Sequence, residues 1–342
     1  MKRRTSLIAS AAGLGAAWLA MRLARARLAI SFDDRVVVIT GGSRGLGLEI
    51  ARRLADEGAH LALLARDAGE LDRARDELTG RGRGSVATFQ CDVRRRSDVR
   101  AAVDAILDRF RRVDALINDA GIIQVGPLEH MTEEDFENAM ATHFWGPLHM
   151  MLELLPSMRH QCFGRIVNIA SIGGKVAVPH LAPYSASKFA LTGLSDAVRA
   201  EVARYGIRVT TVAPGLMRTG SPINAQFKGR HDAEFTWFRA ASSVPGLTIG
   251  AARAAARIVE ACRHGDPALT LTAPAALLAV GNTVAPASVA RAMMVVSRLL
   301  PEATSDPEGN RVRCGRDTLA ARSTPSIAAA LTDRAAAANN EA

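Results

Sequence analysis

Cysteine is scarce in this sequence, and its four copies at positions 91, 162, 262 and 314 lie far apart. No two of them form the Cys-x-x-Cys pair that many zinc sites and redox motifs use. Small secreted domains are often cross-linked by disulfides between many closely spaced cysteines, and this chain lacks that pattern. The sequence therefore argues against a zinc site or a disulfide framework. We predict no metal site and four reduced thiols.

Aromatic residues are also few, at 4%, and no block of alternating basic and aromatic residues occurs. The 342 residues nevertheless carry a formal net charge of +9. Such a charge can indicate a nucleic-acid or anionic-membrane partner, but here it comes mostly from arginines scattered along predicted helices. We therefore predict no nucleic-acid partner, and we expect part of the positive charge to serve a phosphorylated cofactor.

One uncharged stretch, Thr5–Met21, is rich in Ala, Gly and Leu. A bilayer span takes about 20 apolar residues, so this stretch is marginal. Three basic residues lie on each side of it, so charge does not orient it. A short membrane anchor, a cleaved signal peptide and a soluble amphipathic leader are all compatible with it. We favour membrane contact through residues 5–21, and treat residues 1–30 as a leader outside the catalytic domain.

From Arg35 to about Ala213, short runs rich in Val, Ile or Leu alternate with helical stretches. Such runs are typical of strands in a parallel sheet that is buried on both faces. The order predicts an α/β fold over residues 31–265, a Rossmann-type doubly wound parallel sheet in three layers. A helix is expected to begin at the cap Thr132 and to end near Pro156. The predicted strands are Val36–Ile39, Leu61–Ala65, Val86–Cys91, Ala115–Asn118, Arg165–Ala170 and Arg208–Ala213.

Beyond Gly215 the alternation loosens. Residues 216–247 hold a cluster of aromatic side chains, which fits either a substrate lid or an ordinary packed loop and helix. Residues 249–263 are predicted to be helical. Residues 266–300 are expected to form an apolar extension that either packs on the domain or lies on a membrane. Residues 301–342 are expected to form a polar, largely mobile tail. The aromatic cluster consists of Phe227, Phe235, Trp237 and Phe238.

A glycine-rich turn, Thr40-Gly41-Gly42-Ser43-Arg44-Gly45-Leu46-Gly47, follows the first predicted strand. Its glycines permit a tight turn and let the backbone approach a pyrophosphate at a helix N-terminus. The spacing Gly-x-x-x-Gly-x-Gly is not the usual Gly-x-Gly-x-x-Gly, but the strand before it and the helix after it indicate a dinucleotide site. The predicted cofactor-binding residues here are Gly41, Ser43, Arg44, Gly45, Leu46 and Gly47.

The end of the second predicted strand bears on cofactor choice. An NAD site places an acid there to bind the ribose 2′-hydroxyl, but this chain has Ala65 followed by Arg66. Together with Arg44, Arg66 could grip a 2′-phosphate through charge-assisted hydrogen bonds. We therefore favour NADP(H) over NAD(H). If the position that binds the ribose were shifted by one residue, Asp67 would be the ribose acid. Alternatively, Arg66 is only a solvated surface charge.

Tyr184 and Lys188 lie four residues apart, so a helix would place them on one face. A phenol has a pKa near 10 and is a poor base at neutral pH. A neighbouring ammonium favours the phenolate and can lower that pKa. Tyr184 is then the candidate acid and base, Ser171 orients the substrate oxygen, and Lys188 also binds the nicotinamide ribose.

These motifs together resemble the short-chain dehydrogenase/reductase family over roughly residues 33–265. The resemblance implies a dinucleotide-binding oxidoreductase, usually dimeric or tetrameric, with Ser171, Tyr184 and Lys188 as catalytic residues. It also implies that Asp92 and Val93 contact adenine. Further cofactor contacts implied by the family motifs are Asn118, Ala120, Gly121, Pro214, Gly215 and Thr219.

Two positions depart from the family pattern. Asp119 replaces the second asparagine of Asn-Asn-Ala-Gly, and His143 holds the place of a fourth catalytic residue, an asparagine that helps to bind a relay water. A neutral histidine both donates and accepts hydrogen bonds, so it could serve the relay. A buried histidine with a purely structural role is the alternative.

The leading interpretation is an NADP(H)-dependent oxidoreductase that acts on a lipophilic ketone or secondary alcohol. The competing one is a non-catalytic NADP(H)-binding sensor with the same fold, which Asp119 and His143 would permit. NADPH is a cytosolic reagent, so the catalytic domain is expected to face the cytoplasm. A homo-oligomer is also expected.

Overall fold

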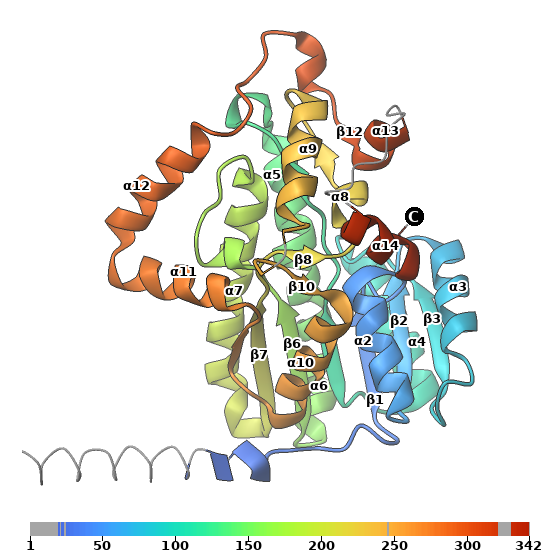
Figure 1. The fold of residues 1–342 in the computed structure, drawn as a ribbon. Coiled ribbons are helices and arrows are strands. Elements are labelled where there is room, and N and C mark those ends of the chain that lie inside the picture. Colours follow the sequence, from blue (N-terminus) through green and yellow to red (C-terminus); the bar gives the residue numbers. More distant parts are fainter. Residues whose placement is uncertain (1–19, 21, 24, 245, 321–329, 342) are drawn as a thin grey trace, which may run out of the picture.

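The computed structural model describes residues 20, 22–23, 25–244, 246–320 and 330–341. Its centre is a seven-stranded parallel sheet in the order β11-β7-β6-β4-β1-β2-β3 (Figure 1). The predicted Rossmann-type sheet is thus confirmed, and β11 is an edge strand that the sequence did not predict. The strands are β1 (Val36–Thr40), β2 (His60–Ala65), β3 (Val86–Gln90), β4 (Ala115–Asn118), β6 (Gly164–Ile169), β7 (Ile207–Ala213) and β11 (Ala268–Thr270).

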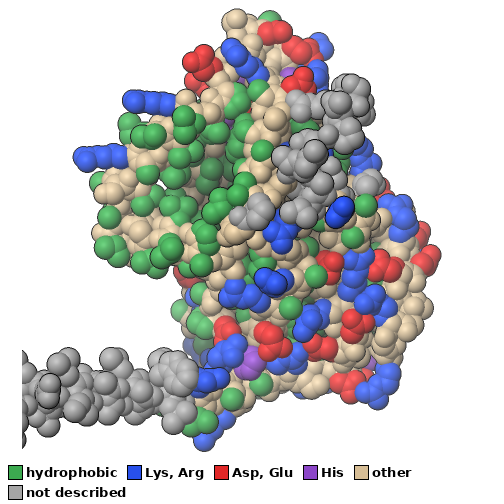
Figure 2. Space-filling model, viewed as in Figure 1, with side chains coloured by type: hydrophobic (Ala, Val, Ile, Leu, Met, Phe, Trp, Pro, Cys, Tyr) green, Lys and Arg blue, Asp and Glu red, His purple; other side chains and the backbone are tan. Residues whose placement is uncertain are grey.

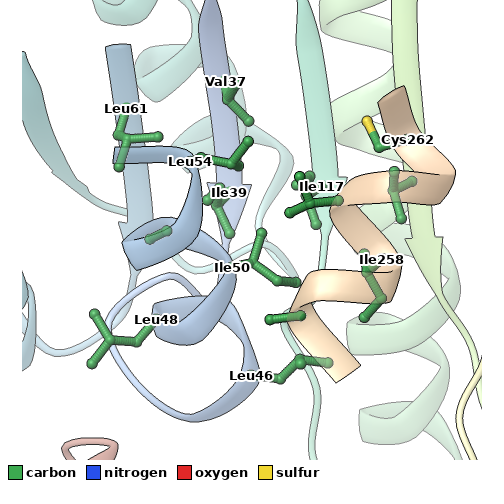
Figure 3. Close-up of a cluster of buried hydrophobic side chains, with 14 of the residues drawn as sticks. Val37, Ile39, Leu46, Leu48, Ile50, Leu54, Leu61, Ile117, Ile258 and Cys262 are labelled. Carbon is green, nitrogen blue, oxygen red and sulfur yellow. The ribbon is translucent and has the colours of Figure 1, made fainter. Parts of the chain in front are cut away.

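Helices cover both faces of the sheet because its strands are apolar on both faces. Val37 and Ile39 of β1 join one core cluster, whereas Val36 and Val38 join the other. Figure 3 shows α2 and α10 packing over β1 and β4 in the first cluster. That layer consists of α2 (Gly45–Asp56), α3 (Ala68–Leu78) and α10 (Ala251–His264), and the opposite layer of α4 (Arg96–Phe110), α6 (Gly146–His160) and α7 (Ala182–Val202).

The strand order reverses beside β1, whose neighbours in the sheet are β2 and β4. In such sheets the crevice at the carboxyl ends of the strands is where ligands bind. The hydroxyl of Thr40, at the end of β1, accepts hydrogen bonds from the backbone amides of Asp119 and Ala120 at 3.1 and 3.2 Å. These bonds tie the end of β1 to the residues after β4, and so fix the crevice at this switch point.

The helix predicted from Thr132 to about Pro156 is interrupted. The expected cap is present as a reciprocal capping box between Thr132 and Asp135. The helix α5 (Glu133–Met140) then gives way to a π-helical turn, η2 (Ala141–Trp145), before α6 begins. The end near Pro156 was also wrong, because α6 continues to His160. A proline in the middle of a helix removes one backbone donor without always ending the helix.

The aromatic cluster of residues 216–247 belongs to a third apolar core. Phe227 and Phe235 are fully buried, and their rings meet edge to face at 5.5 Å. Of the two alternatives that the sequence allowed, the structure therefore favours an ordinary packed loop and helix over a substrate lid. It is built from β8 (Met217–Arg218), α8 (Ser221–Asn224), β9 (Gln226–Phe227) and α9 (His231–Ala241), and β8 pairs with β10 (Ile249–Gly250). The helix predicted over 249–263 is α10, which begins two residues later.

Two helices follow β11 and project from the body of the protein (Figure 1). They are α11 (Ala273–Val284) and α12 (Pro286–Ser297), and with the residues up to Leu300 we call them the α11–α12 arm. Within the described ranges, no helix combines the length and the apolar character needed to cross a membrane. Of the predicted membrane contact 5–21, only Ala20 is described, so this prediction lies outside the described residues.

Residues before and after the predicted domain limits contact the domain. The guanidinium of Arg25 pairs with Asp266 at 2.8 Å, and Arg263 donates a hydrogen bond to the carbonyl of Ile30 at 2.9 Å. The segment expected to be a polar tail contains helices that pack on the sheet domain, with Ala336 fully buried. Its described elements are η5 (Pro307–Asn310), β12 (Arg313–Cys314), α13 (Gly315–Ala320) and α14 (Ala330–Ala338), and β12 pairs with β9, which also pairs with β5 (Gln124–Val125).

Candidate active site

The predicted Ser/Tyr/Lys set meets at the carboxyl end of β6. Ser171 follows this strand and caps the short helix η3 (Ile172–Gly174), accepting a hydrogen bond from the Gly173 amide at 3.0 Å. Tyr184 lies in the first turn of α7 and beside Ser171, since both side chains adjoin Gly173. Lys188 lies one turn further on, with its Nζ atom 5.6 Å from the centre of the Tyr184 ring. A side chain at Gly173 would lie 3.3 Å from that ring, so glycine keeps this corner open.

The pKa of Tyr184 is raised and not lowered, contrary to the effect expected from Lys188. Burial of the phenol is the largest cause, and the charge of Asp119 adds to it, while the hydrogen bond with Ser171 acts in the opposite direction. Lys188 donates from Nζ to the carbonyl oxygen of Ile169 at 2.7 Å. Its own pKa is lowered to about 8 by burial, against the charge of Asp119. The phenol is therefore protonated at neutral pH.

His143 lies in the π-helical turn with both ring nitrogens occupied. The amide of Ile122 donates to Nε2 at 3.1 Å, so Nδ1 carries the proton and donates to the hydroxyl of Ser187 at 2.8 Å. That hydroxyl in turn donates to the carbonyl of Tyr184 at 2.9 Å. Burial, with the charge of Lys188, holds the pKa of His143 well below 6.5, so the ring is neutral. No nitrogen is left to hold a water, which favours the structural interpretation over the relay.

The glycine turn brings β1 and α2 close together. Gly41 has a φ of +72°, and a Cβ atom added to Gly47 would lie only 2.2 Å from the carbonyl oxygen of Gly41. Both positions thus require glycine, the first for its backbone conformation and the second for its close approach. The turn also touches the Asn-Asp-Ala-Gly segment, since an added Cβ on Gly41 would lie 3.0 Å from the backbone of Ala120. Asp119 approaches the same place, and burial raises its pKa to about 8.

The two candidate 2′-phosphate arginines differ in their surroundings. Arg44 pairs with Glu70 at 2.9 Å and also donates to Asn224. Arg66 is exposed at the end of β2. Asp67, the alternative ribose acid, caps α3 by accepting a hydrogen bond from the Glu70 amide at 2.7 Å. This cap commits one Asp67 oxygen to the helix that follows β2.

The remaining predicted contacts line the same crevice. Asp92 is buried, and although burial raises its pKa, hydrogen bonds from Arg94 outweigh that effect and lower it overall. The carbonyl of Pro214 accepts a hydrogen bond from the Ile172 amide at 2.7 Å, which joins this segment to Ser171. Thr219 is buried against Ser221, with their hydroxyls 2.6 Å apart. Asn118 donates to Asn168 at 2.7 Å, and within the described residues its buried Oδ1 atom has no hydrogen-bond partner.

One feature of the crevice was not predicted: the residues after α14 lie in it. The carbonyl of Asn339 accepts a hydrogen bond from the Gly45 amide at 2.9 Å, and Asn340 donates to the carbonyl of Ser43 at the same distance. Glu341 accepts from the Gly220 amide at 2.6 Å. Burial raises the pKa of this carboxyl to about 7. No spacing or composition in the sequence signals these contacts, because they join residues 121 to 297 positions apart.

Comparison with known proteins decides the family. The sequence profile described as short chain dehydrogenase matches residues 35–227. The chain belongs to the short-chain dehydrogenase family. Its members are NAD(P)-dependent oxidoreductases, so the predicted enzyme class is confirmed. Among curated proteins of this family, the chain is 38% identical over 206 residues to "Dehydrogenase/reductase SDR family member 7B" of Danio rerio, covering 59% of this chain and 67% of that one. A "Putative ketoacyl reductase" of Streptomyces coelicolor is 39% identical over 189 residues, covering 55% and 72%.

Solved structures of the family agree with this fold. A short-chain dehydrogenase from Streptomyces avermitilis gives a TM-score of 0.66 at 29% identity, covering 79% of this chain and 99% of that one. A metagenomic short-chain oxidoreductase in complex with NADP gives 0.52 at 34% identity, covering 56% and 86%. A 3-ketoacyl-(acyl-carrier-protein) reductase from Brucella melitensis in complex with NADH gives 0.61 at 26% identity, covering 71% and 98%. One of these neighbours was solved with NADP and another with NADH, so they do not choose between NADP(H) and NAD(H).

Proposed function

We propose that this protein is an NADP(H)-dependent reductase of a lipophilic ketone, or the corresponding alcohol dehydrogenase, with Tyr184 as the general acid and base. The observation that carries the proposal is the contact of the Tyr184 phenol with Ser171 on one side, and the proximity of Lys188 on the other. A hydroxyl pair of this kind has both a proton to give and a second donor to hold the substrate oxygen.

The crevice fits a dinucleotide. The glycine turn has no room for a side chain at Gly47, and an anionic group, the carboxylate of Glu341, lies 3.1 Å from the place where a Cβ of Gly45 would be. The Gly45 amide at the N-terminus of α2 donates to the carbonyl oxygen of Asn339, so the turn offers an oxygen the kind of donor that a pyrophosphate requires. The unpartnered Oδ1 atom of Asn118 offers a buried acceptor at the same edge. The bound cofactor would supply or accept the hydride.

The residues of this chain would handle the proton and the substrate oxygen. Ser171 would hold the carbonyl oxygen by donating a hydrogen bond, and Tyr184 would donate its phenolic proton to that oxygen as negative charge develops there. Burial of the phenol keeps this proton in place at neutral pH. Lys188 is fixed to the carbonyl of Ile169 and would stabilise the phenolate after the transfer.

The preference for NADP(H) is supported by the end of β2. It has no acid at Ala65 or at position 66, and the nearest one, Asp67, serves as a helix cap. Exposed Arg66 is available to a 2′-phosphate, and Arg44 would reach it by exchanging its contact with Glu70. A related metagenomic enzyme was crystallised with NADP, which is compatible with this choice.

A lipophilic substrate is supported by the apolar third core beside the site, in which Tyr184 packs near Leu181 and Phe238. Two relatives are named as putative ketoacyl reductases, which is compatible with a substrate of this character. The test is turnover of purified full-length protein with NADPH or NADH and a panel of aromatic and long-chain ketones. Activity with NADPH that is lost in Tyr184→Phe is expected. Binding of NADPH without turnover of any ketone or alcohol in the panel would favour the sensor interpretation, and a preference for NADH would overturn the cofactor assignment.

A further inference from the structure

The α11–α12 arm is the most apolar exposed part of the described protein. Between Asp266 and Glu302 the sequence has no acidic residue, and its charges are the arginines Arg291 and Arg298. Figure 2 shows hydrophobic side chains covering the projecting helices, with basic groups at their outer edge. The exposed large side chains of the arm are Leu277, Val280, Val284, Met294, Val295, Val296 and Leu299.

The distribution of these side chains around α12 limits what could cover them. No residue of α12 is buried, and the consecutive residues Met294, Val295 and Val296 are exposed by 63%, 57% and 36%. Consecutive positions of a helix point about 100° apart, so three of them spread over most of its circumference. A flat protein surface would cover one side of such a helix. A helix in the interfacial layer of a bilayer lies in the membrane plane, with its apolar side chains in the boundary between headgroups and acyl chains.

The length and charge of the arm fit that layer. Each of its helices has 12 residues and is about 18 Å long, which is too short to cross a hydrocarbon core of about 30 Å. Arginine can bury its aliphatic stem beside apolar groups and keep its charge at the phosphate level. With two arginines and no acid, the arm has the charge complement of an anionic lipid surface.

We propose that the α11–α12 arm docks this protein on the surface of an anionic lipid bilayer. The arm is fixed to the catalytic domain by the buried Ala275 and by a hydrogen bond from Asn282 to the carbonyl of Lys175 at 3.0 Å. Lys175 directly follows the helix capped by Ser171. Docking would therefore hold the Ser171 end of the site beside the membrane. This contact is distinct from that predicted for residues 5–21.

The test places an environment-sensitive dye on the arm of the full chain. Val295→Cys carries the dye in a Cys162→Ser, Cys314→Ser background, and Leu128→Cys, equally exposed on the domain, is the control. With vesicles of equal parts phosphatidylglycerol and phosphatidylcholine, the dye at 295 should become brighter and shift to the blue, and the dye at 128 should not. Replacing Arg291 and Arg298 with Gln should weaken the response by about fivefold for each arginine.

Three results would overturn the proposal. The dye at 295 could remain in a water-like environment both with the mixed vesicles and with vesicles of pure phosphatidylcholine. This result would show that the arm does not contact the bilayer. The arm would instead bind a second copy of the chain if the dye responded without vesicles and the response grew with protein concentration. In that case sedimentation should show a dimer, and Leu299→Glu should abolish both the dimer and the dye response. A response of equal size with pure phosphatidylcholine would refute the anionic specificity.

A second inference comes from the segment Asn339–Glu341, and it rests on the proposed function. The segment accepts hydrogen bonds from the amides of Gly45, a predicted cofactor contact in the glycine turn, and of Gly220, which directly follows the predicted contact Thr219. Arg52 adds hydrogen bonds to the side chain of Asn339 and to the carbonyl of Ala338. We infer that this segment is an internal competitor, so that the dinucleotide binds only after the segment leaves the turn.

Removing the competitor should tighten cofactor binding. The apparent affinity is proportional to the fraction of protein molecules whose site is open, and the segment lowers that fraction. The dissociation constant of NADPH, measured by fluorescence on the full chain, should drop at least severalfold in Glu341→Ala. The control is Glu308→Ala, a carboxylate near the surface that pairs with Arg311. Equal constants in all three proteins would refute the competition. Absence of NADPH and NADH binding in every protein would instead refute the proposed function.

Discussion

Replacing His143 tests whether this residue serves the fold or the chemistry. In His143→Ala the Ile122 amide would lose its acceptor, His143 Nε2, and an orphaned buried donor costs about 1–3 kcal/mol. Loss of the bond to Ser187 and of the ring packing against Tyr184 adds to this. We expect a total destabilisation of about 2–4 kcal/mol in urea unfolding. Turnover of His143→Ala, measured at a urea concentration well below its unfolding midpoint, should differ from that of the wild type by less than tenfold.

The pH dependence of the same variants gives a sharper signature. His143 is neutral in the folded protein, with a pKa well below 6.5, whereas the unfolded chain takes up a proton near 6.5. Below that pH the unfolded state binds more protons, so wild-type stability falls as pH falls. The slope from this group approaches about 1.4 kcal/mol per pH unit. Asparagine does not titrate, so His143→Asn should lose that part of the slope.

The control for this experiment is His160→Asn, a change at an exposed histidine at the end of α6. Its stability should follow the wild-type pH curve more closely than that of His143→Asn does. Turnover lowered by a hundredfold or more in His143→Ala, with unchanged unfolding, would refute the structural role and restore the water relay. Identical pH slopes in wild type and His143→Asn would show that the ring is not held neutral.

Three further predictions concern the candidate site. Tyr184→Phe should lower kcat by roughly 10²–10⁴-fold while the dissociation constant of NADPH stays within a few-fold, because only the proton donor is removed; most of the activity remaining would contradict the mechanism. Arg66→Ala should weaken NADPH tenfold or more and NADH little, since a hydrogen bond to a charged group is worth about 1.5–3 kcal/mol; equal weakening of both would exclude the 2′-phosphate role. Asp119 has a pKa raised from 3.8 to about 8, so the stability that it contributes is present at low pH and is lost as pH rises through about 8. Asp119→Asn should flatten this decline in urea unfolding between those pH values, and an unchanged curve would show that the carboxyl is ionised in the folded protein.

The sheet was predictable because its strands carry their own signal. Each predicted strand lies within one residue of the observed limits, since runs such as Val36–Ile39 are apolar on both faces and admit no other placement. The edge strand β11 has only three residues, and Ala268 is exposed, so nothing in its composition separates it from the apolar extension around it. The break between α5 and α6 was equally invisible, because a π-helical turn keeps the apolar residues of a continuous helix.

The sequence predicted that the candidate site residues lie together, but it did not predict their electrostatics. Spacing placed Ser171, Tyr184 and Lys188 together, because a strand end and two turns of one helix fix where they lie. The sequence could not show how far the Tyr184 phenol would be desolvated, and this burial reverses the expected direction of its pKa. Nor could it show that Ile122 and Ser187 would occupy both nitrogens of His143. Burial and partner choice depend on tertiary contacts that no local pattern records.

The raised pKa of Tyr184 has a consequence for direction. A phenol that keeps its proton at neutral pH is ready to act as an acid, which is the role required for reducing a ketone. Oxidation of an alcohol requires the phenolate, and an added positive charge nearby favours that form. The oxidised nicotinamide ring is positively charged and the reduced ring is neutral. In the proposed mechanism, Tyr184 would therefore be a protonated acid beside the reduced ring, and the positive charge of the oxidised ring would favour its phenolate.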